Sequence, residues 1–150
     1  MLSFISKSFD ELTIVELYEI LALRAEVFVV EQHCPYQDVD GKDINSLHVL
    51  GYLDNRIVAY GRVVEKGISY PDYISIGRIV TSPSVRNKKH GHALVDFALT
   101  VCHKNYPSQP IKISAQAHLE KFYNQHSFLA TGEAYLEDDI PHIGMIYSKK

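Results

Sequence analysis

The first part of the chain changes from the pattern of a strand to that of a helix. Residues 4–8 alternate like a short edge strand. From Thr13 onward, apolar residues recur at helical spacing through about Val30. Thr13 and Glu16 have the spacing of a capping box, in which a hydroxyl and a carboxylate bind the first free amides of a helix. We therefore expect a strand and then a helix that begins at residue 13 and cannot continue past Pro35.

The middle of the chain is rich in β-branched and aromatic residues and predicts three strands. Residues 47–53 and 57–64 are separated by the tight-turn signal Asp54-Asn55-Arg56, so these two runs should pair antiparallel. Residues 73–81 form the next run, and Gly77 within it indicates a bulge or a close approach of another backbone.

The last part of the chain alternates between helices and strands that are separated by turn signals. It predicts a central helix through residues 93–101, a strand over 111–115, a short helix over 119–125 and closing strands over 128–136 and 143–148. The resulting order of elements, β-α-loop-β-β-β-α-β-α-β-β, predicts an α/β or α+β fold in which helices cover a mixed central sheet.

A short basic turn, residues 86–91, lies between the third middle strand and the central helix. A strand that leads through a Gly-containing loop directly into a helix directs unpaired backbone N–H groups and the positive end of the helix to one place. Such a place suits a phosphate or a pyrophosphate. The structural alternative is a plain helix N-terminus with a solvated basic turn.

Length and composition narrow the class of protein. A chain of 150 residues that is 46% hydrophobic fits one compact domain over residues 1–150. The net charge is only -3 with both signs interspersed, so we expect no nucleic acid and no membrane as partner. The sequence leaves the oligomeric state open, with a homodimer as one option.

The same features bear on the compartment. No apolar run approaches the roughly 18 residues of a membrane span, and the N-terminus has acidic residues where a signal peptide is apolar. Cys34 and Cys102 lack a CxxC spacing and should be reduced thiols. We therefore expect a cytoplasmic protein.

The segment VTSPSVRNKKHGHAL, residues 80–94, resembles the acyl-CoA pyrophosphate loop of the GNAT N-acyltransferases, whose core reads (Arg/Gln)-x-x-Gly-x-(Gly/Ala). Arg86 takes the first position and Gly91 the last, whereas Lys89 stands where the family usually has its first glycine. RAEVFVVEQHCPYQDVDG, AQAHLEKFY and IPHIGM are similar to the ElaA-like branch of this superfamily. The resemblance implies the GNAT fold, in which two neighbouring parallel strands splay apart to admit the pantetheine arm of the coenzyme.

The resemblance also implies a site for acetyl-CoA as cosubstrate. Amides of residues 87–92 would hold the pyrophosphate, Arg86 would add charge-assisted contacts, and the strand edge at 79–81 would face the pantetheine arm. His90 and His92 lack further ligands at a suitable spacing, so we expect no metal. The predicted cofactor-binding residues are Ile79, Val80, Thr81, Arg86, Asn87, Lys88, Lys89, His90, Gly91 and His92.

Tyr123 follows Phe122 in a segment similar to the family's FY motif, whose tyrosine commonly acts as a general acid. A phenol has a hydroxyl that can protonate a departing thiolate. The alternative is a tyrosine that only packs in the core. For deprotonation of the amine, the sequence offers Glu31 at the end of the first helix and His118 beside the AQA turn.

The acceptor site is expected from polar residues close to these elements. The long polar connection of residues 31–46 should cover the acceptor side. Its carboxylates, such as Asp38 and Asp40, either recognise an amine or form Asx turns and are solvated. Arg24 either lines the cleft or is a snorkelling helix residue. The predicted substrate-binding residues are Arg24, His48, Arg78 and His142.

The leading hypothesis is an acyl-CoA dependent N-acetyltransferase whose acceptor is a small-molecule or peptide amine, with direct attack in a ternary complex and no acyl-cysteine. One alternative is a synthase of the acyl-homoserine-lactone type, because Arg24, Phe28, Asp38, Asp40 and Arg78 superficially resemble that related fold. The other is a non-catalytic CoA-binding or interaction domain, which the exposed connection permits.

Overall fold

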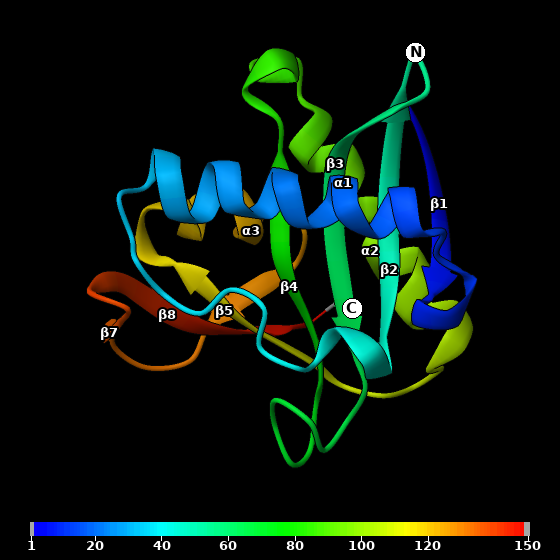
Figure 1. The fold of residues 1–150 in the computed structure, drawn as a ribbon. Coiled ribbons are helices and arrows are strands. Elements are labelled where there is room, and N and C mark those ends of the chain that lie inside the picture. Colours follow the sequence, from blue (N-terminus) through cyan, green and yellow to red (C-terminus); the bar gives the residue numbers. More distant parts are fainter. Residues whose placement is uncertain (1, 149–150) are drawn as a thin grey trace.

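One twisted sheet runs through the molecule, with helices on both of its faces (Figure 1). The computed structural model describes residues 2–148. Over these residues eight strands form the order β1-β2-β3-β4-β5-β8-β6, with β7 paired to β8. The strands are β1 Ser3–Ser8, β2 Ser46–Leu53, β3 Arg56–Val64, β4 Ile74–Thr81, β5 Ile111–Gln116, β6 Phe128–Ala130, β7 Tyr135–Glu137 and β8 Ile140–Tyr147.

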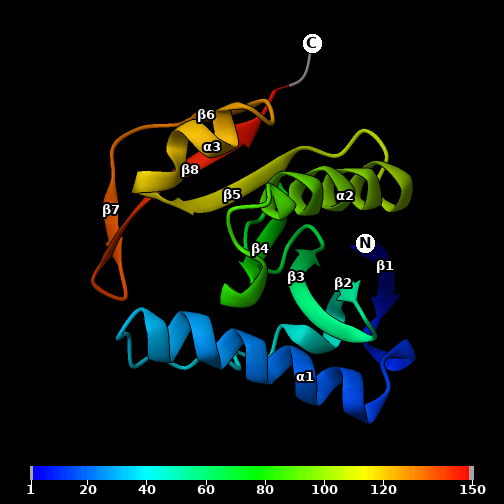
Figure 2. The same cartoon turned by 90° about the horizontal axis from the view of Figure 1, so that it is seen from above.

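The helices form two layers around the sheet, with α1 on one face and α2 on the other (Figure 2). Within residues 2–148, no helix combines the length and the apolar character that crossing a membrane requires. The helices are α1 Ile14–Arg24, α2 His90–Asn105 and α3 Glu120–Asn124, and short 3-10 turns cover Phe9–Glu11, Asp43–Asn45, Pro83–Val85 and Ala117–Leu119.

The predicted α/β arrangement of a mixed sheet flanked by helices is confirmed, as is the start of its first helix. Thr13 Oγ1 accepts a hydrogen bond from the Glu16 amide at 3.0 Å, and the Glu16 carboxylate accepts one from the Thr13 amide at 2.9 Å. After Arg24 the helix continues as a π-helix, Ala25–Glu31. This wider helix extends to Glu31, the position predicted for the end of the first helix.

The hairpin patterns are confirmed except near the C-terminus. β2 and β3 pair antiparallel around a turn in which Asp54 and Asn55 both have positive φ, as a type I′ turn requires. The single strand expected over 128–136 is wrong. It is divided into β6 and β7 because Gly132, with φ of 109°, turns the chain between them.

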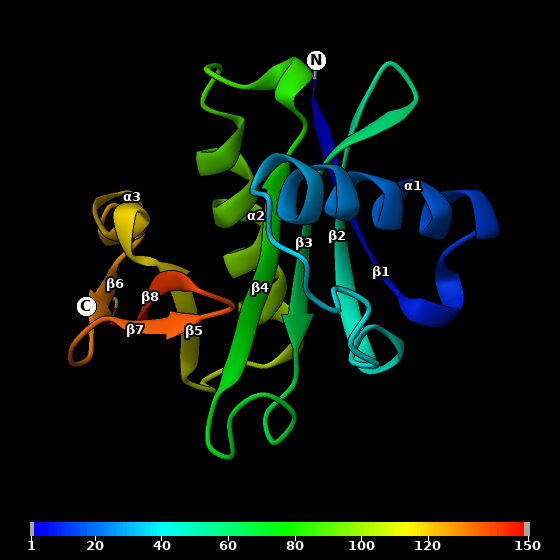
Figure 3. The ribbon, with the colours of Figure 1, turned by 60° about the vertical axis from the view of Figure 1, so that its left-hand side comes forward.

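β4 and β5 are parallel neighbours that separate soon after they meet. Their pairing is limited to Ile74 with Ile111 and Ser75 with Lys112. Figure 3 shows the two strands close at one end and apart at the other. The separation matches the splayed strands that the resemblance to the GNAT family implies.

A bulge in β4 accompanies this separation. The register with β3 shifts between Tyr60 and Arg62, and Arg78 has a positive φ of 51°. The bulge predicted at Gly77 is therefore present, but the left-handed residue is its neighbour Arg78. A side chain with a Cβ is strained in that conformation, so contacts of the arginine must hold it there.

Those contacts belong to a buried network between α1, the sheet and the connection before β2. Three arginines from α1, β3 and β4 meet three aspartates of that connection. We call it the arginine–aspartate cluster: Arg24, Arg62, Arg78, Asp38, Asp40 and Asp43.

Arg24 is the most buried member of the cluster, with no exposed surface. Its Nε donates to Asp38 Oδ2 at 2.9 Å and its Nη1 to Asp43 Oδ1 at 2.8 Å. Arg62 Nη1 donates to the same Asp43 oxygen at 2.9 Å, and its two Nη atoms hold the Asp40 carboxylate at 2.9 and 2.8 Å. Asp38 and Asp43 are buried partners of these arginines and are not solvated. Asp40 is exposed and forms an Asx turn with the Lys42 amide, as the turn alternative proposed, and it also pairs with Arg62 and Arg78.

Two residues predicted to contact the acceptor therefore lie in the core. Arg24 neither lines the cleft nor snorkels to solvent, because its guanidinium is enclosed by Asp38 and Asp43. His48 is 1% exposed; its Nε2 donates to the Asp43 carbonyl and its Nδ1 accepts from the Tyr60 hydroxyl at 2.6 Å. Burial lowers the pKa of His48, so this imidazole is neutral.

The cluster makes a prediction for stability. Asp43→Ala removes a carboxylate shared by two buried guanidinium groups, and we expect it to lower the free energy of unfolding by about 3–5 kcal/mol, because an unpaired buried charge remains. Urea denaturation measures this change. The control Asp72→Ala makes the same charge change in an exposed turn and should stay within about 0.5 kcal/mol of the parent. A loss below about 1 kcal/mol for Asp43→Ala would contradict the structural role of the cluster.

Candidate functional site

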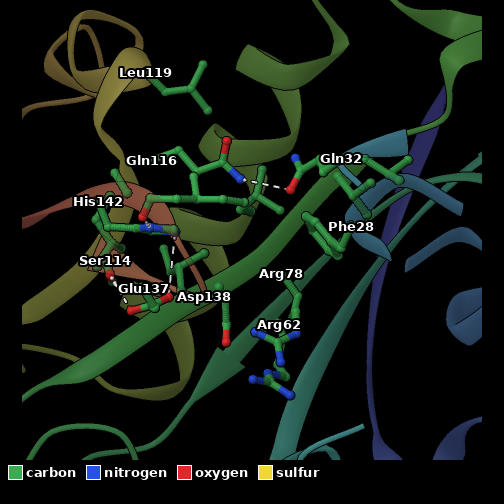
Figure 4. A pocket seen from close by; sticks show the side chains of 18 of the residues that line it. Phe28, Gln32, Arg62, Arg78, Ser114, Gln116, Leu119, Glu137, Asp138 and His142 are labelled. Atoms are coloured by element: carbon green, nitrogen blue, oxygen red, sulfur yellow. Dashed lines mark hydrogen bonds and ion pairs between the residues drawn. The ribbon is translucent and has the colours of Figure 1, made fainter. Parts of the chain in front are cut away.

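A cavity of about 1150 Å³ opens where β4 and β5 separate. Its walls come from the end of the π-helix, from β3 and β4, from β5 and α3, and from the β7–β8 hairpin. Figure 4 shows side chains of these elements on both sides of the cavity. Gln116 Nε2 at the end of β5 donates across it to Gln32 Oε1 at 3.3 Å.

The β4 side of this cavity carries the predicted pantetheine edge. Ile79, Val80 and Thr81 line the cavity, and Val80 and Thr81 pair with β3 on their other side. The parallel pairing with β5 ends at Ser75, so the β5-facing edge of β4 beyond it has no strand partner among the described residues. Backbone groups of this edge that lack a strand partner can bind an extended, amide-rich ligand.

The basic turn forms a second, smaller cavity of about 340 Å³, which shares Thr81, Arg86, Gly91 and Phe122 with the first. The two cavities are therefore neighbouring parts of one surface. Seven of the predicted cofactor residues line the smaller one: Thr81, Arg86, Asn87, Lys89, His90, Gly91 and His92. Lys88 lies in the same turn between them.

The backbone of this turn has the shape of an anion site. Asn87 and Lys89 have φ of 67° and 61°, and α2 begins at His90. Lys89 thus adopts the left-handed conformation at the position where the family motif has glycine, which a glycine adopts without strain. Apart from the bond between Ala93 and Lys89, the amides that open α2 have no partner among the described residues.

Arg86 and Glu31, expected in different roles, form an ion pair. The Arg86 guanidinium contacts the Glu31 carboxylate at 2.5 and 2.7 Å and the Thr81 carbonyl at 3.3 Å. The arginine lowers the pKa of Glu31, and the carboxylate raises the pKa of Arg86. A carboxylate with a lowered pKa is a weaker base, so Glu31 is better placed to hold Arg86 at the mouth of the site than to accept a proton.

Tyr123 lines the main cavity from α3 and is 8% exposed. Its ring meets Phe122 and Phe128 edge to face, with centroids 5.0 and 6.0 Å apart. Burial raises the pKa of Tyr123 to about 12, so the phenol is protonated at neutral pH. His118 also lines the cavity, from an exposed position just before α3.

Hydrogen bonds connect three side chains of α2 and of the segment after α3, next to the basic turn. Asp96 Oδ1 lies 2.9 Å from His126 Nδ1, and His126 Nε2 lies 2.8 Å from His92 Nδ1. Because the carboxylate accepts, His126 donates through Nδ1 and accepts through Nε2 from His92. The Nε2 of His92 is therefore left out of this series of hydrogen bonds. His92, predicted to bind the cofactor through its amide, lines the smaller cavity.

Strand β5 and the β7–β8 hairpin each supply a site residue that the sequence did not predict. His142 was predicted as an acceptor contact and lines the cavity, as does Arg78. The structure adds Ser114 from β5 and Glu137 from β7, with Ser114 Oγ donating to Glu137 Oε1 at 3.0 Å. A signal existed in β5, where Ile111, Ile113 and Ala115 are buried and the alternating residues are more exposed.

The two ends of the cleft differ in charge. The turn at residues 87–92 offers amides and the neighbouring Arg86, whereas the β7–β8 hairpin offers carboxylates. Among the described residues, no three His, Cys, Asp or Glu side chains are arranged to hold a metal ion. The arrangement can bind an anion at one end, an extended amide-rich ligand along β4, and a polar second ligand at the hairpin.

Comparisons with known proteins agree with this geometry. A family model described as an acetyltransferase (GNAT) domain matches residues 15–149. Protein ElaA of Escherichia coli strain K12 is 42% identical over 138 residues, which cover 91% of this chain and 90% of ElaA. An acyl-CoA N-acyltransferase of Pseudomonas aeruginosa is a solved structure with a TM-score of 0.93 and 42% identity, covering 99% of this chain and 100% of that one.

A CoA-dependent acyl-homoserine lactone synthase solved with SAM and isopentyl-CoA also matches, with a TM-score of 0.77, coverage of 99% of this chain and 84% of that one, and 16% identity. A likeness at that identity shows a shared fold alone. The family model and the relatives above 40% identity cover almost the entire sequence. The chain therefore belongs to the GNAT acetyltransferase family and is an acyl-CoA-dependent acyltransferase.

Proposed function

We propose that the chain transfers an acetyl group from acetyl-CoA to the amine of a small molecule or peptide, by direct attack within a ternary complex. The observation that carries this proposal is the continuity of the two cavities. The amide-lined turn at residues 87–92 adjoins the free edge of β4, and that cleft contains the hydroxyl-bearing side chain of Tyr123. One ligand with a diphosphate, an amide-rich arm and a thioester fits this order of sites.

The grip on acetyl-CoA would come from the backbone. The amides that open α2 bind the pyrophosphate, and Arg86 turns from Glu31 to the phosphates as a charge-assisted donor. The edge of β4 at 79–81 binds the two amides of the pantetheine arm as a neighbouring strand would. Holding the thioester beside the acceptor converts a bimolecular reaction into an effectively unimolecular one.

Tyr123 would protonate the departing thiolate. Its phenol begins protonated, because burial raises its pKa to about 12. Tyr123 would donate its proton as negative charge builds up on sulfur, and the attacking nitrogen would lose a proton in the same step. The buried tyrosine therefore never becomes a stable phenolate. The edge-to-face contacts with Phe122 and Phe128 hold the ring in place.

Direct attack is supported by the state of the two cysteines. Cys102 is fully buried in the core, and burial raises its pKa to about 12. Cys34 lines the cavity, but its Sγ donates to the Asp138 carbonyl at 3.4 Å, with no imidazole or other base paired to it among the described residues. Neither thiol has the activation that an acyl-cysteine intermediate requires.

The features behind the acyl-homoserine-lactone alternative have another explanation. Arg24 is enclosed by Asp38 and Asp43, and Arg78 is paired with Asp38 and Asp40. These residues form the internal arginine–aspartate cluster, and Arg24 has no surface to offer a ligand. Amine acetylation is therefore the function that the site supports best.

Binding of acetyl-CoA tests the first part of the proposal. Isothermal titration calorimetry should give saturable heat with the parent. Arg86→Gln should raise the dissociation constant about tenfold, or about 1.4 kcal/mol, because one charge-assisted donor is lost at a partly exposed site. Arg56→Gln, an exposed arginine at the start of β3, is the matched control and should leave the constant unchanged. No heat at high micromolar acetyl-CoA would overturn the proposal.

The role of Tyr123 predicts a selective loss of rate. Tyr123→Phe should lower kcat about 100-fold, since general acid catalysis contributes at least this much, and should leave the affinity for acetyl-CoA unchanged. Steady-state kinetics and calorimetry on the same samples measure the two quantities. Tyr147→Phe removes a hydroxyl from a tyrosine of β8 that packs on Phe128, and serves as control. An unchanged kcat in Tyr123→Phe would assign Tyr123 to packing alone.

The ternary complex predicts the kinetic pattern. With any amine that is turned over, double-reciprocal plots at several acetyl-CoA concentrations should intersect, because both substrates are bound when the bond forms. Intact-protein mass spectrometry after incubation with acetyl-CoA alone should detect no acetyl adduct. Parallel lines together with an acetylated Cys34 would establish the covalent route instead.

A further inference from the structure

A group of four polar side chains lines the end of the cleft away from the basic turn. Ser114 comes from β5, Tyr135 and Glu137 from β7, and His142 from β8. Figure 4 shows Ser114, Glu137 and His142 together on one wall, across the cavity from Phe28 and Arg78. We call these four residues the hairpin cluster.

The hydrogen bonds of the hairpin cluster have a single consistent direction. Ser114 Oγ donates to Glu137 Oε1 at 3.0 Å, because a carboxylate only accepts. With its proton used in this way, Ser114 accepts from the Tyr135 hydroxyl, 2.5 Å away. The Ser114 hydroxyl, itself held by Tyr135, thus occupies Oε1 of Glu137, and the other oxygen, Oε2, remains as an acceptor.

The backbone fixes the tautomer of His142. Its Nδ1 lies 2.7 Å from the Ile140 carbonyl oxygen, so Nδ1 carries the hydrogen. In the neutral ring Nε2 then has a lone pair, and it lies 3.6 Å from Glu137 Oε2, which is too long for a hydrogen bond. With the ring in this tautomer, two acceptors face each other with no donor between them among the described residues.

The surrounding charges favour a cation at this place. Glu31 is paired with Arg86, and Asp40 with Arg62 and Arg78, whereas Glu137 has no arginine or lysine partner among the described residues. The neighbouring acid is Asp138, which follows Glu137 in the turn and also lines the cavity.

The other titratable groups at this wall contact aromatic rings. The Tyr135 ring stacks on the His142 ring with centroids 6.4 Å apart. Burial raises the pKa of Tyr70 to about 12, and Tyr135 and Glu137 add to the shift. Lys112 of β5 has its Nζ 4.9 Å from the centroid of the Tyr70 ring, in a cation–π contact.

We infer that the acceptor is a primary amine that arrives as an ammonium ion, and that Glu137 Oε2 and His142 Nε2 bind it between them. This inference rests on the proposed function and assigns the base that the function needs. His142 Nε2 takes one proton from the ammonium and becomes an imidazolium beside Glu137, which stabilises it. The neutral amine then attacks the thioester carbon, a C–N bond forms and the C–S bond breaks. Tyr123 protonates the departing sulfur, the second nitrogen proton restores that phenol, and His142 returns its proton to solvent.

The binding part is tested without turnover. Histidine ring nitrogens are followed by NMR while 2-phenylethylammonium chloride is added, a probe whose ring suits a wall that carries Tyr70 and Tyr135. The free protein should show His142 as the Nδ1–H tautomer, and the probe should shift its Nε2 resonance. The uncharged analogue 2-phenylethanol should not.

Two variants make this titration specific. Glu137→Gln keeps an acceptor for Ser114 and removes the charge, and it should weaken the response at least tenfold. Glu133→Gln makes the same change at an exposed position before β7 and should respond as the parent does. An equal shift with the alcohol, an unaffected Glu137→Gln, or an Nε2–H tautomer in the free protein would each overturn the ammonium site.

The catalytic part is tested by rate and pH. His142→Asn retains a donor for the Ile140 carbonyl and lacks the ring base, so kcat should fall about 100-fold with the acetyl-CoA affinity unchanged. The remaining kcat of His142→Asn should rise tenfold per pH unit up to the pKa of the amine, because the fraction of free amine grows. The kcat of the parent should reach a plateau at a lower pH. A parent-like plateau in His142→Asn would overturn the role as base. If acetyl-CoA fails to bind, the proposed function fails, and the ammonium site is still decided by the NMR titration alone.

Discussion

The structure depends on a set of buried charges that are satisfied only when three distant parts of the chain meet. Each guanidinium of the arginine–aspartate cluster comes from a different element, and its partners come from one irregular connection. A buried charge without a partner is so unfavourable that the connection, α1 and the sheet must dock together. Arg78 connects the cluster with the cleft, because its pairing with Asp38 and Asp40 holds the left-handed bulge that follows the last residue of β4 paired with β5.

The cleft that results has ends of opposite character. Helix-opening amides and Arg86 favour an anion at one end, and the carboxylate of Glu137 favours a cation at the other. The arginines of the cluster do not disturb this polarity, because their charges are neutralised within the protein. The ion pair of Glu31 and Arg86 lies at the entrance of the cleft, where Arg86 can exchange its carboxylate partner for a phosphate of the ligand.

The sequence was informative where structure is decided by neighbours along the chain. The capping box at Thr13, the turn at Asp54-Asn55 and the basic turn before α2 depend on a few adjacent residues, and each has its expected position. The break at Gly132 was missed because an apolar alternation continued across it.

Long-range relations were the part that local patterns could not give. Arg24 and His48 are polar residues in apolar segments, and only the distant aspartates of the cluster decide that they belong to the core. Similarly, Ser114 and Glu137 meet because β5 and β7 both flank β8, a pairing that spans 23 residues of sequence. Functional groups assembled across strands leave no spacing that a single sequence reveals.

The two-pair contact between β4 and β5 has a dynamic consequence. It divides the sheet into one part made of β1 to β4 and another made of β5 to β8, joined by backbone hydrogen bonds only at their base and by the side chains packed around α2. In proteins, segments joined by so few backbone hydrogen bonds tend to open as separate cooperative units in amide exchange. A coenzyme bound along the open edge would take the place of the missing strand and add hydrogen bonds where the two parts have none.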